Sequence, residues 1–153
     1  EKLVQWDQKV EPLAALGFGQ ANLIVAVPQC WVDVDTLDDL DGAAAAFRAR
    51  HGFRMRIATK YHRLVRDYLR QGGVADYQLV DSQGATEGTV KNLTAEAIAD
   101  ITSTGETLRA NHLKVLDEEP VLKSQATLFR SRVAQKSDAD RAVLKDLITQ
   151  LGI

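Results

Sequence analysis

The spacing of apolar and polar residues predicts short strands and helices that alternate along most of the chain. Strands are expected where short runs are β-branched or alternate apolar with polar residues, at residues 21–28, 53–59, 76–82 and 96–103. Helices are expected between the first three strands, at residues 43–51 and 60–71. Acidic residues precede the first of these helices, and glycine follows each of them, as helix termini favour.

The remaining segments predict shorter elements. The first twenty residues are interpreted as a helix that ends in a turn, and short helices are expected within 84–93 and 104–111. Two more strands are expected, at 113–119 and 121–131. Ser137, with Asp140 three residues later, predicts the start of a final helix that continues through Leu151. This alternation is typical of an α/β domain with a largely parallel sheet.

Composition narrows the class of protein. The chain has 153 residues, of which 45% are hydrophobic and 26% charged, so wholesale disorder is not expected. The formal net charge of -2 argues against a broadly basic surface that grips nucleic acid. A single cysteine, Cys30, excludes an intramolecular disulfide and suits a reducing compartment. With neither a membrane span nor a secretory signal in the sequence, we expect a cytoplasmic protein without a membrane partner.

The segment from Glu96 to Asn111 carries the strongest chemical signal. Residues two apart on a strand share a face, so Glu96 and Asp100 could accept hydrogen bonds from ribose hydroxyls or hold hydrated Mg²⁺. The hydroxyl-rich turn that follows enters a helix, where backbone N–H groups and a glycine can cradle phosphate. The alternative is that Ser103 and Thr104 only cap that helix. Physical reasoning on the residues leaves both interpretations open.

Four ordered motifs resemble one known family. ADITSTGETLRAN (99–111) is similar to the phosphoribosyl-pyrophosphate loop of ATP phosphoribosyltransferase, the first enzyme of histidine biosynthesis. The other three are GFGQANLIVAVP (17–28), RIATKY (56–61) and VDSQGATEGTV (80–90), and they occur in that family's order. The resemblance runs from about Gly17 to Arg130.

The resemblance implies a fold, a reaction and a set of binding residues. The fold would be two α/β lobes like those of type II periplasmic binding proteins, each with a mixed, largely parallel sheet and with the active site between the lobes. The reaction would transfer phosphoribose from phosphoribosyl pyrophosphate to N1 of ATP, with Mg²⁺, and release pyrophosphate. The implied substrate-binding residues are Glu96, Asp100, Thr102, Ser103, Thr104, Gly105, Glu106 and Thr107. Of these, Thr104 to Thr107 would cradle the 5-phosphate, and Asp100 and Glu96 would face the ribose. Glu87 matches an acid that the family keeps ahead of the loop.

The chain also departs from the family pattern. Glu96 stands where the family usually has Asp, and Thr89-Val90 replaces Ala-Pro. The Lys-Gly-Arg-Leu motif of the first lobe is absent from the sequence. The resemblance therefore implies a fragment of a short-form enzyme, without a regulatory domain and inactive alone. Its parts would be the tail of the first lobe (1–18), the second lobe (19–126) and a return segment with a C-terminal helix (127–153).

Partners and rival functions follow from the same resemblance. Short-form members work with a regulatory subunit that resembles histidyl-tRNA synthetase, and a homo-oligomer is expected. One rival is a non-catalytic module of the same fold that binds a small anion. Another is a degenerate paralogue that keeps the fold as a regulatory subunit, which the departures at Thr89-Val90 and Glu96 would favour.

Other reactive side chains give weaker signals. His51, His62 and His112 lack metal-ligand spacing, so surface or capping roles are expected for them. Cys30 has no activating base nearby in the sequence and is expected to be packed or partly exposed. A basic cluster is interpreted as a solvated face, with the alternative that Arg56 or Lys60 helps to hold polyphosphate; the cluster comprises Arg48, Arg50, Arg54, Arg56 and Lys60.

Overall fold

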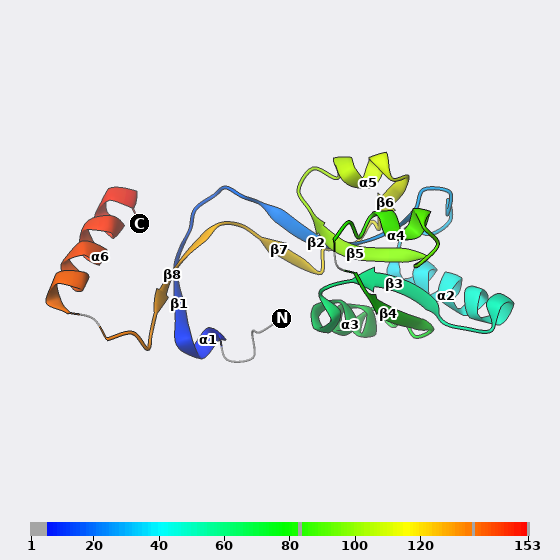
Figure 1. The fold of residues 1–153 in the computed structure, drawn as a ribbon, viewed down its shortest axis with the longest axis horizontal. Coiled ribbons are helices and arrows are strands. Elements are labelled where there is room, and N and C mark those ends of the chain that lie inside the picture. Colours follow the sequence, from blue (N-terminus) through cyan, green and yellow to red (C-terminus); the bar gives the residue numbers. More distant parts are fainter. Residues whose placement is uncertain (1–5, 83, 136, 153) are drawn as a thin grey trace. The chain divides into compact units, whose positions relative to one another are not determined.

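The computed structural model describes residues 6–82, 84–135 and 137–152. The chain divides into two compact units, shown in Figure 1. The first unit includes residues 21–124, and the second combines residues 2–20 with residues 125–153.

The first unit is built on a mixed β-sheet with strand order β4-β3-β5-β2-β6, and β7 pairs with β2. Its strands are β2 (Ala21–Pro28), β3 (Met55–Thr59), β4 (Tyr77–Asp81), β5 (Ala97–Thr102), β6 (Leu113–Val115) and β7 (Leu122–Ser124). β3 runs parallel to β4 and β5, whereas β2 is antiparallel to β5, β6 and β7. The parallel pairing expected from the sequence is therefore confined to β4, β3 and β5, and the strands that end this unit pair antiparallel with β2.

Helices connect these strands, and residues next to the helix ends determine where α2 begins and ends. They are α2 (Leu37–His51), α3 (His62–Gln71), α4 (Gly88–Lys91) and α5 (Glu106–Ala110). Thr36 caps α2, because its Oγ1 accepts a hydrogen bond from the Asp39 N–H at 3.2 Å, and Asp39 Oδ2 accepts one from the Thr36 N–H at 2.9 Å. The side-chain hydrogen bond from Thr36 lowers the pKa of Asp39. Gly52 ends α2 with a φ of 78°, a left-handed conformation that favours glycine.

Two apolar clusters pack on opposite faces of the sheet, because alternate residues of a strand point to opposite faces. On one face, Leu23 and Val25 of β2 pack with the buried residues of α2 and α3, including Leu40 and Leu69. On the other face, β5 contributes Ile98, and the cluster includes Leu108 of α5 and, partly buried, Val90 of α4. Figure 1 shows α2 and α3 on one side of the sheet and α4 and α5 on the other. The residues that alternate with Ala97 and Ala99 along β5 therefore face α4 and α5.

The second unit contains a two-stranded sheet that the sequence did not predict. A short helix, α1 (Trp6–Lys9), leads into β1 (Val10–Ala15), which pairs antiparallel with β8 (Thr127–Ser131). The helix expected over the first twenty residues is wrong from residue 10 onward, and residues 1–5 lie outside the described part. Pro12 is tolerated in β1 at a register irregularity between residues 12 and 14.

The strand expected over 121–131 is in fact two strands in two different sheets. β7 pairs with β2 in the first unit, and β8 pairs with β1 in the second. Neither assignment follows from local pattern, because each strand takes its partner from about one hundred residues away. Glu11 and Arg130 lie opposite each other in the β1–β8 pair, and Arg130 Nη2 donates to Glu11 Oε2 at 2.8 Å.

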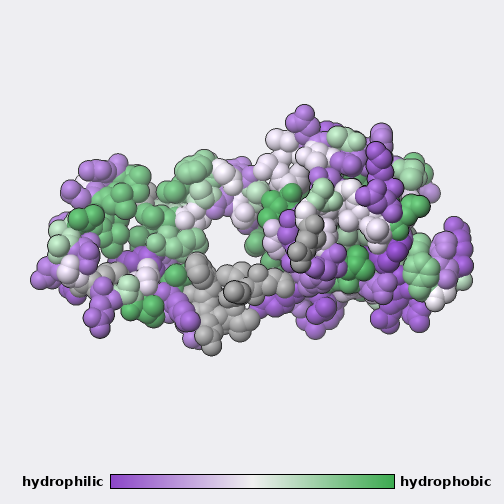
Figure 2. Space-filling view, viewed as in Figure 1, coloured by the Kyte–Doolittle hydropathy of each residue, from purple (hydrophilic) through white to green (hydrophobic). Residues whose placement is uncertain are grey.

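The final helix, α6 (Asp138–Leu151), starts where the sequence predicted. Ser137 Oγ accepts from the Asp140 N–H, and Asp140 Oδ2 accepts from the Ser137 N–H, which completes a capping box. Apolar residues of α6 are exposed, including Val143 at 69% and Leu151 at 47%, and Figure 2 shows hydrophobic surface over this part of the second unit. In the described part of the chain, no helix is long and apolar enough to cross a membrane.

Candidate functional site

The three parallel strands end at one edge of the sheet, and the segments that follow them carry polar side chains. Lys60 follows β3, Ser82 follows β4, and the hydroxyl-rich turn follows β5. Ligands of open α/β sheets bind outside the carboxyl ends of the strands. The segments identified from the sequence therefore meet at the edge where such a site is expected.

The turn between β5 and α5 is held by its own hydroxyl groups. The Gly105 N–H donates to Thr102 Oγ1 at 3.0 Å, and the Glu106 N–H donates to Thr104 Oγ1 at 3.3 Å. Gly105 adopts a φ of 70°, which a residue with a Cβ would adopt only with strain. Arg109 Nη1 also donates to the Thr104 carbonyl at 3.2 Å. The Thr102 and Thr104 hydroxyl groups therefore fix the shape of the turn. The N-cap residue of α5 is Gly105, not Ser103 or Thr104 as the capping interpretation expected.

A cleft of about 320 Å³ opens beside this turn, and six of the residues nominated from the sequence line it. These are Glu87, Asp100, Thr102, Ser103, Thr104 and Thr107. Three apolar residues that were not nominated complete the wall, namely Ile98, Ile101 and Leu108. Of these three, Ile98 could have been predicted from strand alternation, because it lies two residues before Asp100 and shares its face of β5. Gly105 and Glu106 belong to the turn without lining the cleft.

Asp100 is an acid of the cleft whose side chain is only 16% exposed. Its Oδ1 lies 4.0 Å from Lys60 Nζ and accepts a hydrogen bond from the Ile101 N–H at 2.9 Å. β3 and β5 are parallel neighbours, which brings the end of β3 beside the end of β5. The structure therefore pairs the expected cation Lys60 with the expected acid Asp100.

Glu87 reaches the cleft from a segment that buried hydroxyl groups hold in place. Ser82 Oγ donates to Thr86 Oγ1 at 3.0 Å, and both residues are buried. The Ser82 N–H donates to the Thr59 carbonyl at 3.3 Å, which ties the segment to the end of β3. Sequence reasoning missed Ser82 and Thr86, because no local pattern separates a buried hydroxyl from one in solvent. Residue 83 lies outside the described residues.

Glu96 is not brought to this cleft. It precedes Asp100 by four residues, which is about 13 Å along an extended strand. Its Oε2 accepts from the Arg56 backbone N–H at 2.7 Å and from Arg56 Nε at 3.2 Å, and its Oε1 accepts from Arg56 Nη2 at 2.5 Å. Strand alternation predicted that Glu96 and Asp100 share a face, but Glu96 lies before β5 and pairs with Arg56, whereas Asp100 lies beside Lys60.

Arg56 is held by the same ion pair. Its Nη2 also donates to the Leu93 carbonyl at 3.0 Å, and the side-chain hydrogen bond with Glu96 raises the pKa of Arg56. A guanidinium engaged on both sides is poorly placed to hold polyphosphate. Of the two basic residues nominated from the sequence, Lys60 is the one beside the cleft.

Replacing the paired carboxylate should separate stability from binding. Glu96→Gln is expected to lower the free energy of unfolding by about 1–2 kcal/mol, because it removes charge-assisted hydrogen bonds to Arg56 in a mostly buried setting. Urea unfolding measures this loss. The binding of a phosphoribosyl ligand, followed by calorimetry on the same variant, should change by less than about threefold. A large loss of binding with unchanged stability would instead mean that Glu96 contacts the ligand.

The other candidate residues do not form a second reactive centre. Within the described ranges, no group of three or more His, Cys, Asp or Glu side chains could hold a metal ion. The His62 Nε2 lies 3.4 Å from Asp81 Oδ1, and the His51 ring lies 4.3 Å from the Phe47 ring, measured between centroids. Cys30 is exposed.

Comparison with known proteins gives a consistent result. A family model described as "HisG: ATP phosphoribosyltransferase" matches residues 1–152. A protein of Cereibacter sphaeroides named ATP phosphoribosyltransferase is 73% identical over 139 residues, which are 91% of this chain and 59% of that protein. A protein of the same name from Mesorhizobium japonicum is 52% identical over 153 residues, covering 99% of this chain and 66% of the relative. The chain thus spans about three fifths to two thirds of the length of these relatives.

Solved structures agree on the fold. The ATP phosphoribosyl transferase (HisG:HisZ) complex from Thermotoga maritima matches with a TM-score of 0.68 at 17% identity, over 97% of this chain and 65% of that one. An ancestral amino acid-binding protein, AncCDT-1, matches with a TM-score of 0.58 at 12% identity, over 97% of this chain and 57% of that one. At these identities the matches show a shared fold.

Proposed function

The chain belongs to the ATP phosphoribosyltransferase (HisG) family, and we propose that it contributes the phosphoribosyl-pyrophosphate site of an enzyme that transfers phosphoribose to N1 of ATP. Pyrophosphate is the second product, and the reaction is the first step of histidine biosynthesis. The observation that carries the proposal is the cleft at the carboxyl ends of the parallel strands. There Asp100 and Glu87 share one wall with the hydroxyl-rich turn.

The cleft offers complementary chemistry for the two halves of a phosphorylated sugar. Thr104 and Thr107 of the turn line the cleft, and their hydroxyl groups can donate hydrogen bonds to the 5-phosphate. Asp100 lies on β5, the strand that leads into the turn. There its carboxylate can accept hydrogen bonds from the ribose hydroxyls. An anion-binding module has little use for Asp100 and Glu87 in such a cleft, because these carboxylates would repel the anion.

Mg²⁺ fits this site as an ion shared with the substrate. Glu87 and Asp100 line one cleft, and the described residues hold no cluster of three or more ligands. Mg²⁺ is commonly bound by one or two carboxylates together with substrate phosphates, and it keeps several waters. Asp100 and Glu87 are the residues that would hold it. When bound, the ion would neutralise charge on the departing pyrophosphate.

The chain's own residues act by position and charge. Transfer of phosphoribose passes through a state in which the ribose ring carries positive charge, and a nearby carboxylate stabilises that charge. Asp100 orients the ribose, and the turn holds the 5-phosphate, so the reactive carbon is presented to the adenine nitrogen in a fixed geometry. No residue is assigned as a nucleophile.

The proposal extends to the arrangement and partners of the whole protein. Residues 19–126 are the second lobe, residues 1–18 belong to the first, and residues 127–153 return to it. The enzyme forms a homo-oligomer and works with a regulatory subunit that resembles histidyl-tRNA synthetase. The T. maritima structure supports a second subunit, because it is named as a HisG:HisZ complex. The enzyme works in the cytoplasm.

Thermal unfolding with and without ligand tests the proposed site. Phosphoribosyl pyrophosphate with Mg²⁺, at about 100 times its dissociation constant, should stabilise the chain by about 2.7 kcal/mol. The readout is a raised unfolding midpoint in scanning calorimetry. Mg²⁺ with pyrophosphate and Mg²⁺ with ATP are the controls, and each should give a smaller shift. Equal shifts with pyrophosphate alone would favour the anion-binding module over the transferase.

A further inference from the structure

A second cleft, of about 460 Å³, lies away from the loop site and is lined by arginines. Arg54, Arg66 and Arg70 contribute its charge, and Val74, Tyr77 and Leu79 contribute much of its remaining wall. Arg54 immediately precedes β3, and Tyr77 begins β4, so the cleft starts at the amino ends of these strands. The loop site lies beyond their carboxyl ends. The two clefts share no lining residue.

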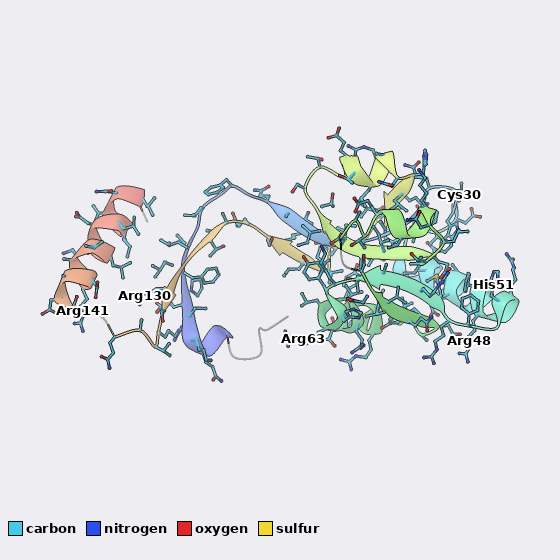
Figure 3. The ribbon with its side chains drawn as sticks, viewed as in Figure 1. Cys30, Arg48, His51, Arg63, Arg130 and Arg141 are labelled. Atoms are coloured by element: carbon cyan, nitrogen blue, oxygen red, sulfur yellow. The ribbon has the colours of Figure 1, made fainter. Side chains whose placement is uncertain are left out.

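The fold of α3 gathers these arginines. Arg63, Arg66 and Arg70 are spaced by three and four residues, so they follow one face of the helix, while Val65 and Leu69 are buried in the core. Figure 3 shows Arg63 on this helix, and Figure 2 shows hydrophilic surface over it. β4 is the last strand of the sheet at this side. The cleft is therefore open along the edge of β4.

The arginines outnumber the carboxylates that neutralise them. Arg66 forms no ion pair with any described residue, and Arg70 pairs only with the exposed Asp67, three residues earlier on the same helix. Arg54 reaches Asp76 at 4.0 Å, and that carboxylate already pairs with Arg48. Exposed ion pairs of this kind stabilise little. Like charges held together in a cleft without acidic lining favour the binding of an anion.

The lining specifies the kind of anion. Planar guanidinium groups donate paired hydrogen bonds to phosphate oxygens, and more than one arginine suits more than one phosphoryl group. Burial raises the pKa of Tyr77, the charges of Arg66 and Arg70 act on the same hydroxyl in the opposite direction, and the charge of Asp67 adds a smaller rise. The Tyr77 hydroxyl therefore lies in the field of both arginines and stays protonated at neutral pH, as a hydrogen-bond donor. Val74 and Leu79 add an apolar wall.

We propose that this arginine cleft is a second binding site, for an anion that carries two or more phosphoryl groups. The site is separate from the one proposed for phosphoribosyl pyrophosphate, and its occupant need not be a substrate. It would couple the chain to the supply of a phosphorylated metabolite through a surface that the reaction does not use.

Calorimetric titration with inorganic pyrophosphate tests the proposal, in EDTA to remove Mg²⁺ and at low ionic strength. Arg66→Gln/Arg70→Gln should weaken binding about tenfold or more, because it removes the two α3 guanidinium groups that line the cleft. Lys60→Gln reports on the loop site and should leave this binding unchanged. Arg50→Gln/Lys91→Gln removes the same charge from exposed positions that line neither cleft. Circular dichroism checks that each variant folds.

Each result has one meaning for the proposal. A loss confined to the Arg66/Arg70 variant supports the arginine cleft. Loss in Lys60→Gln alone would move the pyrophosphate to the loop site and overturn the inference, while leaving the proposed function intact. Equal losses of pyrophosphate binding in the Arg66/Arg70 and Arg50/Lys91 variants would mean that only the net charge of the chain matters. That result would also overturn the inference. Failure of the proposed function is a separate result, namely no Mg²⁺-dependent binding of phosphoribosyl pyrophosphate.

Discussion

Asp100→Asn is expected to abolish the stabilisation of this chain by phosphoribosyl pyrophosphate and Mg²⁺. The wild-type gain is about 2.7 kcal/mol when ligand is present at about 100 times its dissociation constant, and a hundredfold weaker affinity would reduce it to about 0.4 kcal/mol. The carboxylate is 16% exposed and lines the cleft beside Lys60, so its charge acts where water is largely excluded. Asparagine keeps one oxygen, loses the charge and adds an N–H donor that cannot accept from a ribose hydroxyl.

The variant should fold normally, which makes the result readable. The Ile101 N–H donates to Asp100 Oδ1, and an asparagine oxygen can accept that hydrogen bond. Scanning calorimetry without ligand should therefore give a midpoint close to that of the unsubstituted chain. Asp146→Asn on the exposed face of α6 is the matched control for loss of one carboxylate. If Asp100→Asn kept the full ligand-dependent shift, the assignment of Asp100 to the ribose would be wrong.

Leu40→Ala is expected to lower the free energy of unfolding of the first unit by about 2–5 kcal/mol. Leu40 is fully buried in the cluster that joins α2 and α3 to the sheet, so truncation leaves a cavity among well-packed neighbours. Urea unfolding followed by circular dichroism measures the loss. Val32→Ala, at a side chain that is 71% exposed, should change the same free energy by less than about 0.5 kcal/mol.

The same variant separates the two faces of the sheet. Leu40 lies in the cluster on the α2 and α3 face, whereas the loop site rests on the α4 and α5 face. Under conditions where the variant is folded, its affinity for phosphoribosyl pyrophosphate should stay within about threefold of the unsubstituted chain. A large loss of affinity would mean that packing on one face controls the geometry of the cleft on the other.

Elements with local causes were predictable from the sequence. β2 follows from its β-branched run, α2 ends at a glycine with positive φ, and α6 starts at a capping box formed by residues three apart. The turn at Gly105 is local in the same way, because its hydroxyls bond to backbone groups two or three residues away. These features depend on propensity and short-range hydrogen bonds, which neighbouring residues determine by themselves.

Pairings across long stretches of chain were not predictable, and they decided the rest. Residues 10–15 form a strand because β8 supplies a partner, and residues 121–131 divide between two sheets for the same reason. Strand alternation predicted that Glu96 and Asp100 share a face. The pairing of β3 with β5 instead places Glu96 beside Arg56 and Asp100 beside Lys60, so the two carboxylates have different partners. The sequence by itself therefore determined the local elements, the family and the loop motif. Only the tertiary structure decided which side chains share the cleft, because the register of distant strands sets the distances between them.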